Sequence, residues 1–353
     1  MTNRERFLNT LRGKPSDRIP MTEICFWPDT IQRWEKEGLP EKTDPLDFLR
    51  MERITIAGFD CSLQIDKKMI EETADWKIET DENGVTMKSW KTAYAPPQEL
   101  DFKIKTESDW KQLKPRLVAT WERFSRETIA AMEQAHTDGN LVTIRPEEPC
   151  WFALRTIGHK ECLELMALEP AFIEDIIATK TDFILEMMAL GLTHGLTYDA
   201  LWFFSDLCYR GGMLFSPAIY RRMILPYHRK VKDFCTRNNL PLLIHCCGDV
   251  RQLIPLLMEA GFDCVQPLEA RAGNDVRKLK PLHGNKMAFF GNINIDVLAR
   301  GNQKEIEEEV VTKVEAAKAG GGYIFHSDHS VPPTVSFASY RLAVELARKH
   351  GVY

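Results

Sequence analysis

Residues 240–250 read Leu240-Pro241-Leu242-Leu243-Ile244-His245-Cys246-Cys247-Gly248-Asp249-Val250. A short apolar run that follows a proline and leads to a glycine predicts a buried parallel strand. The residues after it, 249–254, predict the start of a helix that Asp249 caps. A buried strand followed by a helix is the repeating unit of parallel α/β sheets. Any chemistry in this stretch is therefore expected at the carboxyl end of the strand.

His245 and Cys247 are two residues apart, so an extended backbone projects both side chains to the same side. An imidazole and a thiolate on one face form half of a typical zinc site. Two residues do not make a complete site, because zinc needs a third and a fourth ligand. The alternative interpretation is a buried histidine beside two small apolar cysteines, since free cysteine is among the most buried residue types.

The chain has 353 residues, enough for one large α/β domain or two smaller ones with a substantial core. Its 44% hydrophobic and 27% charged content is typical of a globular protein. A net charge of -5 provides no basic field for nucleic acid or for an anionic membrane surface. Small molecules or another protein are therefore the expected partners.

The sequence contains no apolar run close to the roughly 20 residues that span a bilayer. Its first residues lack the apolar core of a signal peptide. The nine cysteines are an odd number scattered through apolar segments, unlike a secreted disulfide framework. These features predict a cytoplasmic protein in a reducing compartment.

Short apolar runs that alternate with helical patterns give eight candidate strands, near Ile19, Ser62, Leu141, Leu201, Leu242, Cys264, Ala288 and Tyr323. Eight parallel strands alternating with helices predict an α/β fold of the (β/α)8 TIM-barrel type, with a doubly wound open sheet as the alternative. We expect residues 1–353 to form a single domain. Residues 76–102, around the turn signal Asn83-Gly84, are expected to form an N-terminal hairpin insertion too short to own a core.

A barrel gathers its reactive residues just after the strands, at the carboxyl-terminal face. The sequence follows this rule at six strand ends, with Glu147, Glu148, Ser205, Asp206, Cys208, His245, Cys247, Glu269, Asn292, Asn294, His326, Asp328 and His329. Each residue alone has an ordinary explanation: Asp206 could cap a helix and Glu269 could be solvated. Their convergence on one face favours a functional site.

Several stretches resemble the uroporphyrinogen decarboxylase superfamily over nearly the full length. They are Arg4-Glu5-Arg6-Phe7, Asp17-Arg18-Ile19-Pro20, Gly291-Asn292-Ile293-Asn294, Val297-Leu298-Ala299-Arg300-Gly301, Gly321-Gly322-Tyr323-Ile324-Phe325 and His329-Ser330-Val331-Pro332-Pro333. The resemblance implies a (β/α)8 barrel, in agreement with the strand count.

Two branches of this superfamily differ in their sites. The decarboxylases grip an acidic porphyrinogen with an arginine-rich segment after the first strand, but residues 23–29 here contain no arginine. The corrinoid-dependent methyltransferases hold zinc with a His-x-Cys pair and a distant cysteine. His245-Cys246-Cys247 is similar to that pair, and the third position falls on His329. The resemblance thus implies His245, Cys247 and His329 as zinc ligands.

Further roles follow for residues at the same face. Asp206 is expected to be a catalytic acid or base, or a fourth ligand. Glu148, Glu269 and Asn292 are candidates for substrate contacts. Cys246 points to the other side of its strand and is expected in the core, while His326 competes with His329 for the third ligand position.

These features predict a zinc-dependent methyltransferase that moves a methyl group between a small O-, N- or S-linked substrate and a corrinoid (cobalamin). The chain lacks the Asp-x-His-x-x-Gly pattern of cobalamin-binding domains, so the corrinoid is expected on a separate protein that docks at the carboxyl-terminal face. Two alternatives stay open. One is a metal-free decarboxylase or lyase that uses Asp206 and His329, and the other is a barrel that binds a ligand without turnover.

Overall fold

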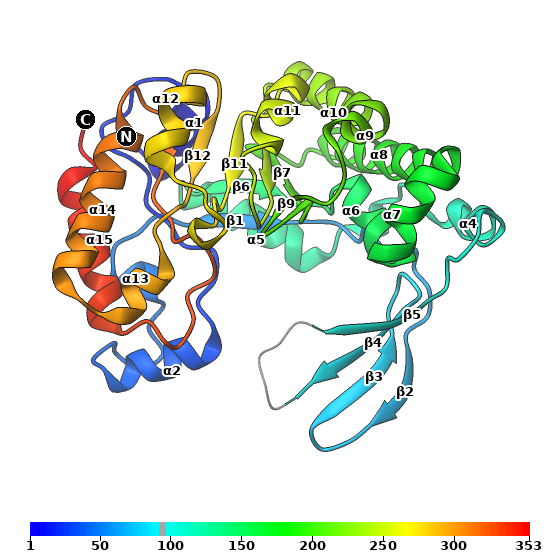
Figure 1. Cartoon of the computed structure of the whole chain (residues 1–353), viewed down its shortest axis with the longest axis horizontal. Helices are drawn as coiled ribbons and strands as arrows, with labels where there is room; N and C mark the ends of the chain where they lie inside the picture. Colours follow the sequence, from blue (N-terminus) through cyan, green and yellow to red (C-terminus); the bar gives the residue numbers. More distant parts are fainter. Residues whose placement is uncertain (92–96) are drawn as a thin grey trace.

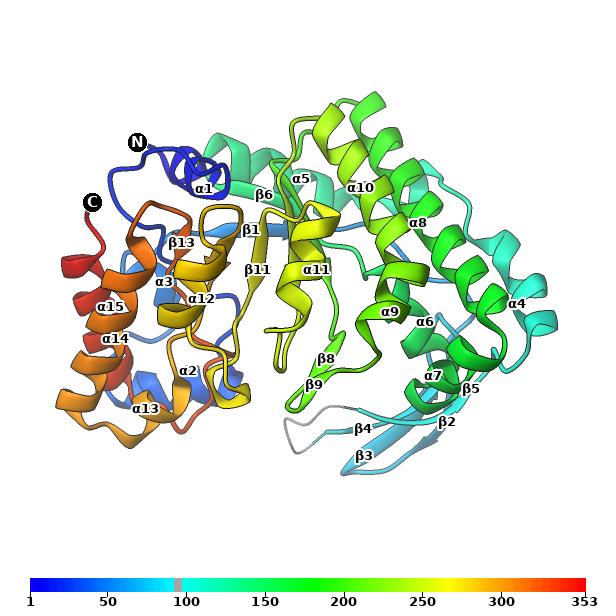
Figure 2. The same cartoon turned by 45° about the horizontal axis from the view of Figure 1, so that its top comes forward.

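The computed structural model describes residues 1–91 and 97–353. Within these ranges, seven parallel strands form one sheet in the order β1-β6-β7-β10-β11-β12-β13. The strands are β1 (Ile54–Ala57), β6 (Leu141–Ile144), β7 (Ala200–Phe204), β10 (Leu242–His245), β11 (Cys264–Gln266), β12 (Ala288–Phe290) and β13 (Tyr323–Ile324). Figures 1 and 2 show that this sheet is curled and that helices lie outside it.

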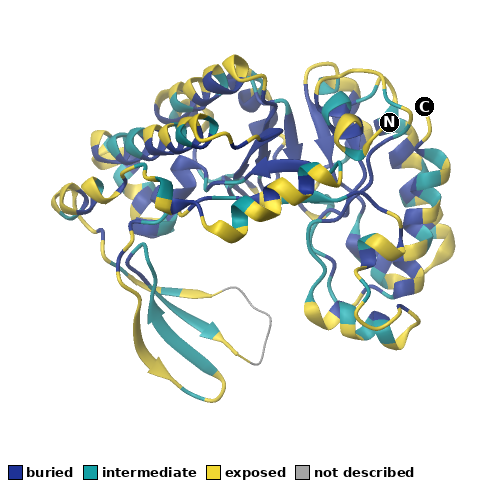
Figure 3. Ribbon diagram, turned by 180° about the vertical axis from the view of Figure 1, so that it is seen from behind, coloured by how far each residue is buried: buried dark blue, intermediate teal, exposed yellow. Residues whose placement is uncertain are grey.

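Helices connect the successive strands of this parallel sheet, and others lie before β1 and after β13. They are α1 (Asn3–Leu11), α2 (Pro28–Lys36), α3 (Pro45–Phe48), α4 (Glu107–Leu113), α5 (Arg126–Thr137), α6 (Pro149–Ile157), α7 (His159–Leu168), α8 (Pro170–Thr193), α9 (Pro217–Ile219), the π-helix η3 (Tyr220–Ile224), α10 (Leu225–Arg237), α11 (Leu253–Ala260), α12 (Val276–His283), α13 (Ile295–Arg300), α14 (Gln303–Lys318) and α15 (Phe337–His350). Figure 3 shows their exposed outer faces around a buried sheet.

The strands bury both faces, and alternate residues enter two different cores. Leu201, Phe203, Leu242 and Ile244 belong to the large core between sheet and helices. Trp202 and Leu243, with the alternate residues of the other strands, fill a smaller inner core that Phe7 and Leu11 of α1 also enter. Whether a side chain at a strand end points toward the inner or the outer core therefore depends on its place in this alternation, which we call its parity.

The first strand, expected near Ile19, is wrong as a regular element. In the described part of the chain, residues 18–26 make only isolated bridges: two are parallel, Met21 with Phe325 and Phe26 with Val331, and one is antiparallel, Arg18 with Val352. The carbonyl of Met21 also accepts a 2.7 Å hydrogen bond from the Glu52 amide, near the opposite edge of the sheet. Pro20 has no N–H to donate, which shortens any ladder here. Closure of the curled sheet into a complete eight-stranded barrel stays a prediction.

The strand expected near Ser62 is also wrong. The corresponding strand is β1, eight residues earlier in the β-branched run around Ile54. Asp60 instead accepts a 2.9 Å hydrogen bond from the Ser62 amide, and Arg123 donates to the carbonyls of both residues. These local bonds favour a turn over an extended strand.

A second, antiparallel sheet projects from the body of the molecule in Figure 1. Its strands are β2 (Lys68–Glu72), β3 (Trp76–Thr80), β4 (Val85–Trp90) and β5 (Gln98–Phe102). β3 and β4 pair on either side of Asn83 and Gly84. The expected insertion over 76–102 includes residues 92–96, which lie outside the described residues. A short hairpin, β8 (Cys208–Tyr209) with β9 (Gly212–Met213), follows β7.

Candidate metal centre

Alternation along the parallel strands carries a set of polar side chains into one cavity at the carboxyl-terminal strand ends. Arg145, Asp206 and Gln266 share the inward parity of Leu141, Trp202 and Cys264, and His245 and Cys247 share that of Leu243. The cavity is lined by Glu23, Ile24, Cys25, Arg145, Phe204, Asp206, His245, Cys247, Gln266, Pro267, His326, His329 and Ser330. Cys246 has the opposite parity and lies fully buried in the outer core.

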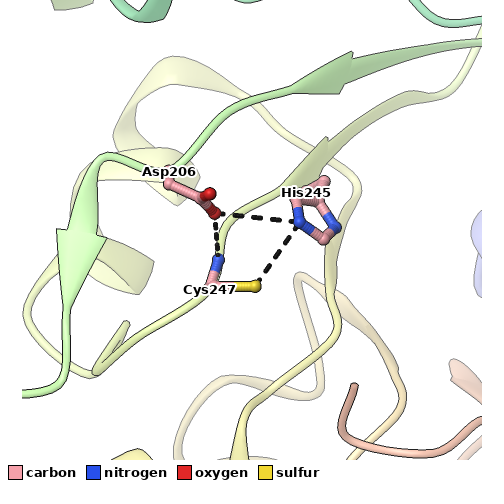
Figure 4. Close-up of side chains that lie close together, drawn as sticks. All are labelled: Asp206, His245 and Cys247. Atoms are coloured by element: carbon pink, nitrogen blue, oxygen red, sulfur yellow. Dashed lines mark hydrogen bonds and ion pairs between the residues drawn. The ribbon is translucent and has the colours of Figure 1, made fainter. Parts of the chain in front are cut away.

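Asp206, His245 and Cys247 bring three potential ligand atoms within 4.8 Å of one another. The thiol Sγ of Cys247 lies 3.5 Å from Nε2 of His245, and Oδ1 of Asp206 lies 3.7 Å from the same nitrogen. Oδ1 of Asp206 also accepts a 2.9 Å hydrogen bond from the backbone N–H of Cys247. Figure 4 shows the three side chains facing a common point. The sequence-predicted pair and Asp206 are thus together.

The turn after β10 fixes this cluster, and it requires a glycine. Gly248 has a φ of +86°, and a Cβ there would lie 2.7 Å from backbone atoms of Tyr209. The Asp249 amide donates a 2.9 Å hydrogen bond to the Tyr209 carbonyl, so the turn packs against the β8–β9 hairpin. A side chain at residue 248 would therefore displace the hairpin that follows Asp206.

The second nitrogen of His245 is held by the neighbouring strand. Nδ1 lies 2.6 Å from Oε1 of Gln266, a side chain that is 2% exposed. The imidazole also stacks on Phe204, with ring centroids 5.1 Å apart. An N–H on Nδ1 leaves the Nε2 lone pair directed toward Cys247 and Asp206, which is the tautomer that a metal ligand needs.

Burial sets the charge state of the cluster. It lowers the pKa of His245 to about 3, so the imidazole is neutral at physiological pH. Burial also raises the pKa of the Cys247 thiol well above its usual range, and the Asp206 and Glu269 carboxylates raise that pKa further. The pKa of Asp206 is raised by burial too. Keeping the Cys247 thiolate and the Asp206 carboxylate ionised side by side is therefore unfavourable unless a cation neutralises them.

This donor set fits a zinc ion. Zinc binds imidazole nitrogen, thiolate sulfur and carboxylate oxygen, and its charge would stabilise the two anions that burial disfavours. In the described part of the chain, no lysine or arginine forms an ion pair with Asp206.

His329 lines the same cavity but is outside the three-residue cluster. Its loop is fixed by the buried Asp328, which accepts hydrogen bonds from the amides of Ile295 (3.0 Å) and Ala270 (2.9 Å). His326 is engaged elsewhere: Nε2 lies 2.6 Å from Oε1 of Glu23, and Nδ1 contacts the Ser327 carbonyl. Whether His329 is a ligand stays a prediction.

The three candidates for substrate contacts do not line the cavity. Glu148 is fully buried, caps α6 through the Trp151 amide and pairs with His228 at 2.9 Å. Asn292 is fully buried too, and its side chain bonds backbone groups of three other residues. Glu269 accepts a 2.9 Å hydrogen bond from the Gly248 amide. In this geometry all three support loops around the site, and their contact with substrate stays a prediction.

Three cavity residues were missed from the sequence: Arg145, Gln266 and Glu23. The first two sit at inward parity at a strand end, so extending the alternation by one residue would have found them. Glu23 lies on an irregular segment where no such pattern exists. Its carboxylate is buried and accepts hydrogen bonds from Ser327 Oγ (2.7 Å) and Tyr340 OH (2.9 Å) in addition to contacting His326.

Comparisons with known proteins agree with this architecture. The curated relatives include a uroporphyrinogen decarboxylase of Citrifermentans bemidjiense, 36% identical over 126 residues, 35% of each chain. Another is a methylated-thiol–coenzyme M methyltransferase of Methanosarcina mazei, 26% identical over 154 residues, 42% of this chain and 39% of that protein. The chain therefore matches little more than a third of the length of these relatives.

A solved structure of a methyltransferase from Methanosarcina mazei has the same fold. It superposes with a TM-score of 0.67 at 14% identity, over 99% of both chains. None of the described helices combines the length and apolar character needed to span a membrane. The family model for uroporphyrinogen decarboxylase (URO-D) matches residues 149–350, which include β7, β10 and the loop after β13. Since that match covers more than half of the sequence, the chain belongs to the URO-D family.

Proposed function

We propose that this chain is a zinc-dependent methyltransferase that moves a methyl group between a small O-, N- or S-linked substrate and a corrinoid protein. The observation that carries the proposal is the meeting of His245 Nε2, Cys247 Sγ and the Asp206 carboxylate within 4.8 Å at the strand ends. The similarity to a methylated-thiol–coenzyme M methyltransferase supports the reaction class.

His245 and Cys247 would hold the zinc, with His329 as a further ligand from the loop after β13. Bound zinc would act as a Lewis acid that improves a heteroatom leaving group or lowers the pKa of a thiol acceptor. Gln266 keeps the His245 tautomer fixed through Nδ1. Asp206 would complete the ligand set or take the proton of an accepting group.

The parts of the fold that go with this proposal are a closed (β/α)8 barrel and a single domain over residues 1–353, with the segment around 76–102 as an insertion. Met21 would close the barrel through its contacts with Phe325 and Glu52. The corrinoid would be carried by a separate protein that docks at the carboxyl-terminal face, in the cytoplasm.

A test combines metal analysis with a methyl-transfer assay. Purified protein should contain close to one zinc per chain, and it should demethylate free methylcob(III)alamin in the presence of thiol acceptors, followed by the cobalamin absorbance. Removal of the metal by a chelator should abolish the transfer, and zinc should restore it. Protein that folds without binding zinc would rule the proposal out.

A metal-free decarboxylase or lyase is the second candidate, favoured by the 36% identity to a uroporphyrinogen decarboxylase. In that case Asp206 and His329 would do acid and base work without metal. Release of carbon dioxide from a carboxylated substrate, unaffected by chelators, would distinguish it from the methyltransferase.

A further inference from the structure

We propose that Arg145 is the binding residue for a carboxylate on the small-molecule substrate. The residue follows β6 directly, and its backbone amide is fixed by a 2.9 Å hydrogen bond to the carbonyl of Ala57 at the end of β1. Its side chain has the inward parity of Thr143 and lines the same cavity as His245 and Cys247. Nothing in the proposed zinc chemistry uses this cation.

The guanidinium is positioned by two aromatic rings. Its central carbon lies 4.8 Å from the ring centroid of Trp202 and 4.9 Å from that of Phe204. Phe204 in turn stacks on the imidazole of His245. Stacking of this kind orients an arginine without occupying its N–H donors, which lie in the plane of the group. One aromatic ring thus links Arg145 to the metal cluster.

The donors of Arg145 have no partner in the part of the chain that the structure describes. Nε is buried and makes no hydrogen bond, and the side chain forms no ion pair. Its surroundings also make it unusual: burial lowers the pKa of Arg145 to about 10, although Asp206 and Cys247 partly offset this. A partly buried guanidinium whose buried Nε has no partner is unfavourable unless a ligand satisfies it.

The other charges around the cavity are already matched. Glu23 is bonded by His326, Ser327 and Tyr340. Asp206 and Cys247 would be neutralised by the metal. Among the described residues that line the cavity, Arg145 is the one arginine or lysine, and it is left to face the substrate. A planar carboxylate fits its fork in a bidentate way.

This inference rests on the proposed function only for the reacting group: the substrate would carry its methyl-bearing heteroatom toward the His245–Cys247 side and its carboxylate toward β6. Arginine and carboxylate attract each other with or without a metal. The two proposals therefore can be tested separately.

The test is fluorine NMR of small fluorinated anions with the purified full-length protein. The probes are fluoroacetate, 4-fluorobenzoate and 4-fluorophenylacetate, with 4-fluorobenzamide as a neutral match and 4-fluorobenzenesulfonate as a non-planar oxyanion. We expect at least one carboxylate to bind, and more tightly than the amide and the sulfonate. Arg145→Met should weaken its binding about 10- to 100-fold, and Arg145→Lys should weaken it less. Arg126→Met, which changes an exposed arginine in α5, should leave it unchanged.

Several results would overturn the inference: no carboxylate binds the wild type, the amide binds as tightly as the carboxylate, or Arg145→Met keeps full affinity. If Arg145→Met does not fold by circular dichroism, the weaker binding expected of Arg145→Lys carries the test. Cys247→Ala separates the two proposals. Carboxylate affinity that depends on Cys247 and not on Arg145 would show that the anion binds the metal. That result would contradict this inference and support the zinc site. Arg145-dependent carboxylate binding in a protein that holds no zinc would support this inference and contradict the zinc site.

Discussion

Nδ1 of His245 lies 2.6 Å from the side-chain oxygen of Gln266, on the neighbouring strand β11. The contact orients the imidazole before any metal binds, and the loss of a hydrogen-bond partner of a metal-binding imidazole typically changes metal affinity 10- to 100-fold. We expect Gln266→Leu to weaken zinc binding by about that factor, measured by competition with a chromogenic chelator. Gln266→Glu should retain most of the affinity, because a carboxylate also accepts from Nδ1. Gln303→Leu, at an exposed position of α14, is the matched control. Equal affinity in Gln266→Leu and wild type would show that the contact does not tune the metal.

Cys246 and Cys247 should respond in opposite ways to the same substitution. Cys247→Ser should lose most of the bound zinc, because a hydroxyl is a poor ligand compared with a thiolate. Cys246→Ser should keep the zinc but lower the free energy of unfolding by about 1–3 kcal/mol, because its side chain is fully buried in the outer core. Metal content and urea denaturation measure the two effects. Zinc loss in the Cys246 variant instead would place the wrong cysteine in the site.

Zinc affinity should rise with pH, by about tenfold per unit between pH 6 and 8. Burial and nearby carboxylates raise the pKa of the Cys247 thiol, so the metal must displace a proton from it. His245 contributes no proton in this window, because its pKa is lowered to about 3. The sign follows: fewer protons compete with zinc at higher pH. Affinity that does not change across this range would exclude the thiol of Cys247 as a ligand.

Much of this arrangement could be predicted from the sequence, because strand alternation is local. The same-side placement of His245 and Cys247, and the core position of Cys246, follow from a period of two along β10. The place of Asp206 follows from a different local rule, that reactive residues of a barrel gather just after the strands, here after the apolar run of β7. By contrast, Glu148 looks like an exposed strand-end carboxylate, yet it caps α6 and pairs with His228, a residue 80 positions away. Such long-range pairing leaves no local pattern.

The errors in the fold have a similar origin. The runs around Ile19 and Ser62 have strand-like composition, but Pro20 interrupts one ladder and the bonds from Arg123 hold the other segment in a turn. Neither effect can be predicted from the local sequence, because each depends on where distant residues lie in the fold.

The pair between Glu148 and His228 should matter for stability more than for binding. Both side chains are fully buried, and Tyr220 contacts the other nitrogen of His228 at 2.8 Å. Breaking a buried pair leaves an uncompensated polar or charged group, at about 3–5 kcal/mol. His228→Phe should lower the free energy of unfolding by roughly that amount and leave zinc affinity unchanged. If Glu148→Gln altered ligand affinity without changing stability, Glu148 would act at the site after all.

His329 is expected to contribute to the metal site, and His326 is not. Both imidazoles line the cavity, but His326 uses its nitrogens on Glu23 and the Ser327 carbonyl. His329 stands on a loop that buried Asp328 ties to the amides of Ile295 and Ala270, so the ligand would lose little freedom on binding.

Substitution by cysteine in cobalt-loaded protein separates the two histidines. His329→Cys should keep the metal and strengthen the sulfur-to-cobalt charge-transfer absorption, because a second thiolate joins the site. His326→Cys is the matched control and should leave that absorption unchanged. A stronger band in the His326 variant, with none in the His329 variant, would assign the ligand to the strand end instead of the loop, and would require the Glu23 contact to open when metal binds.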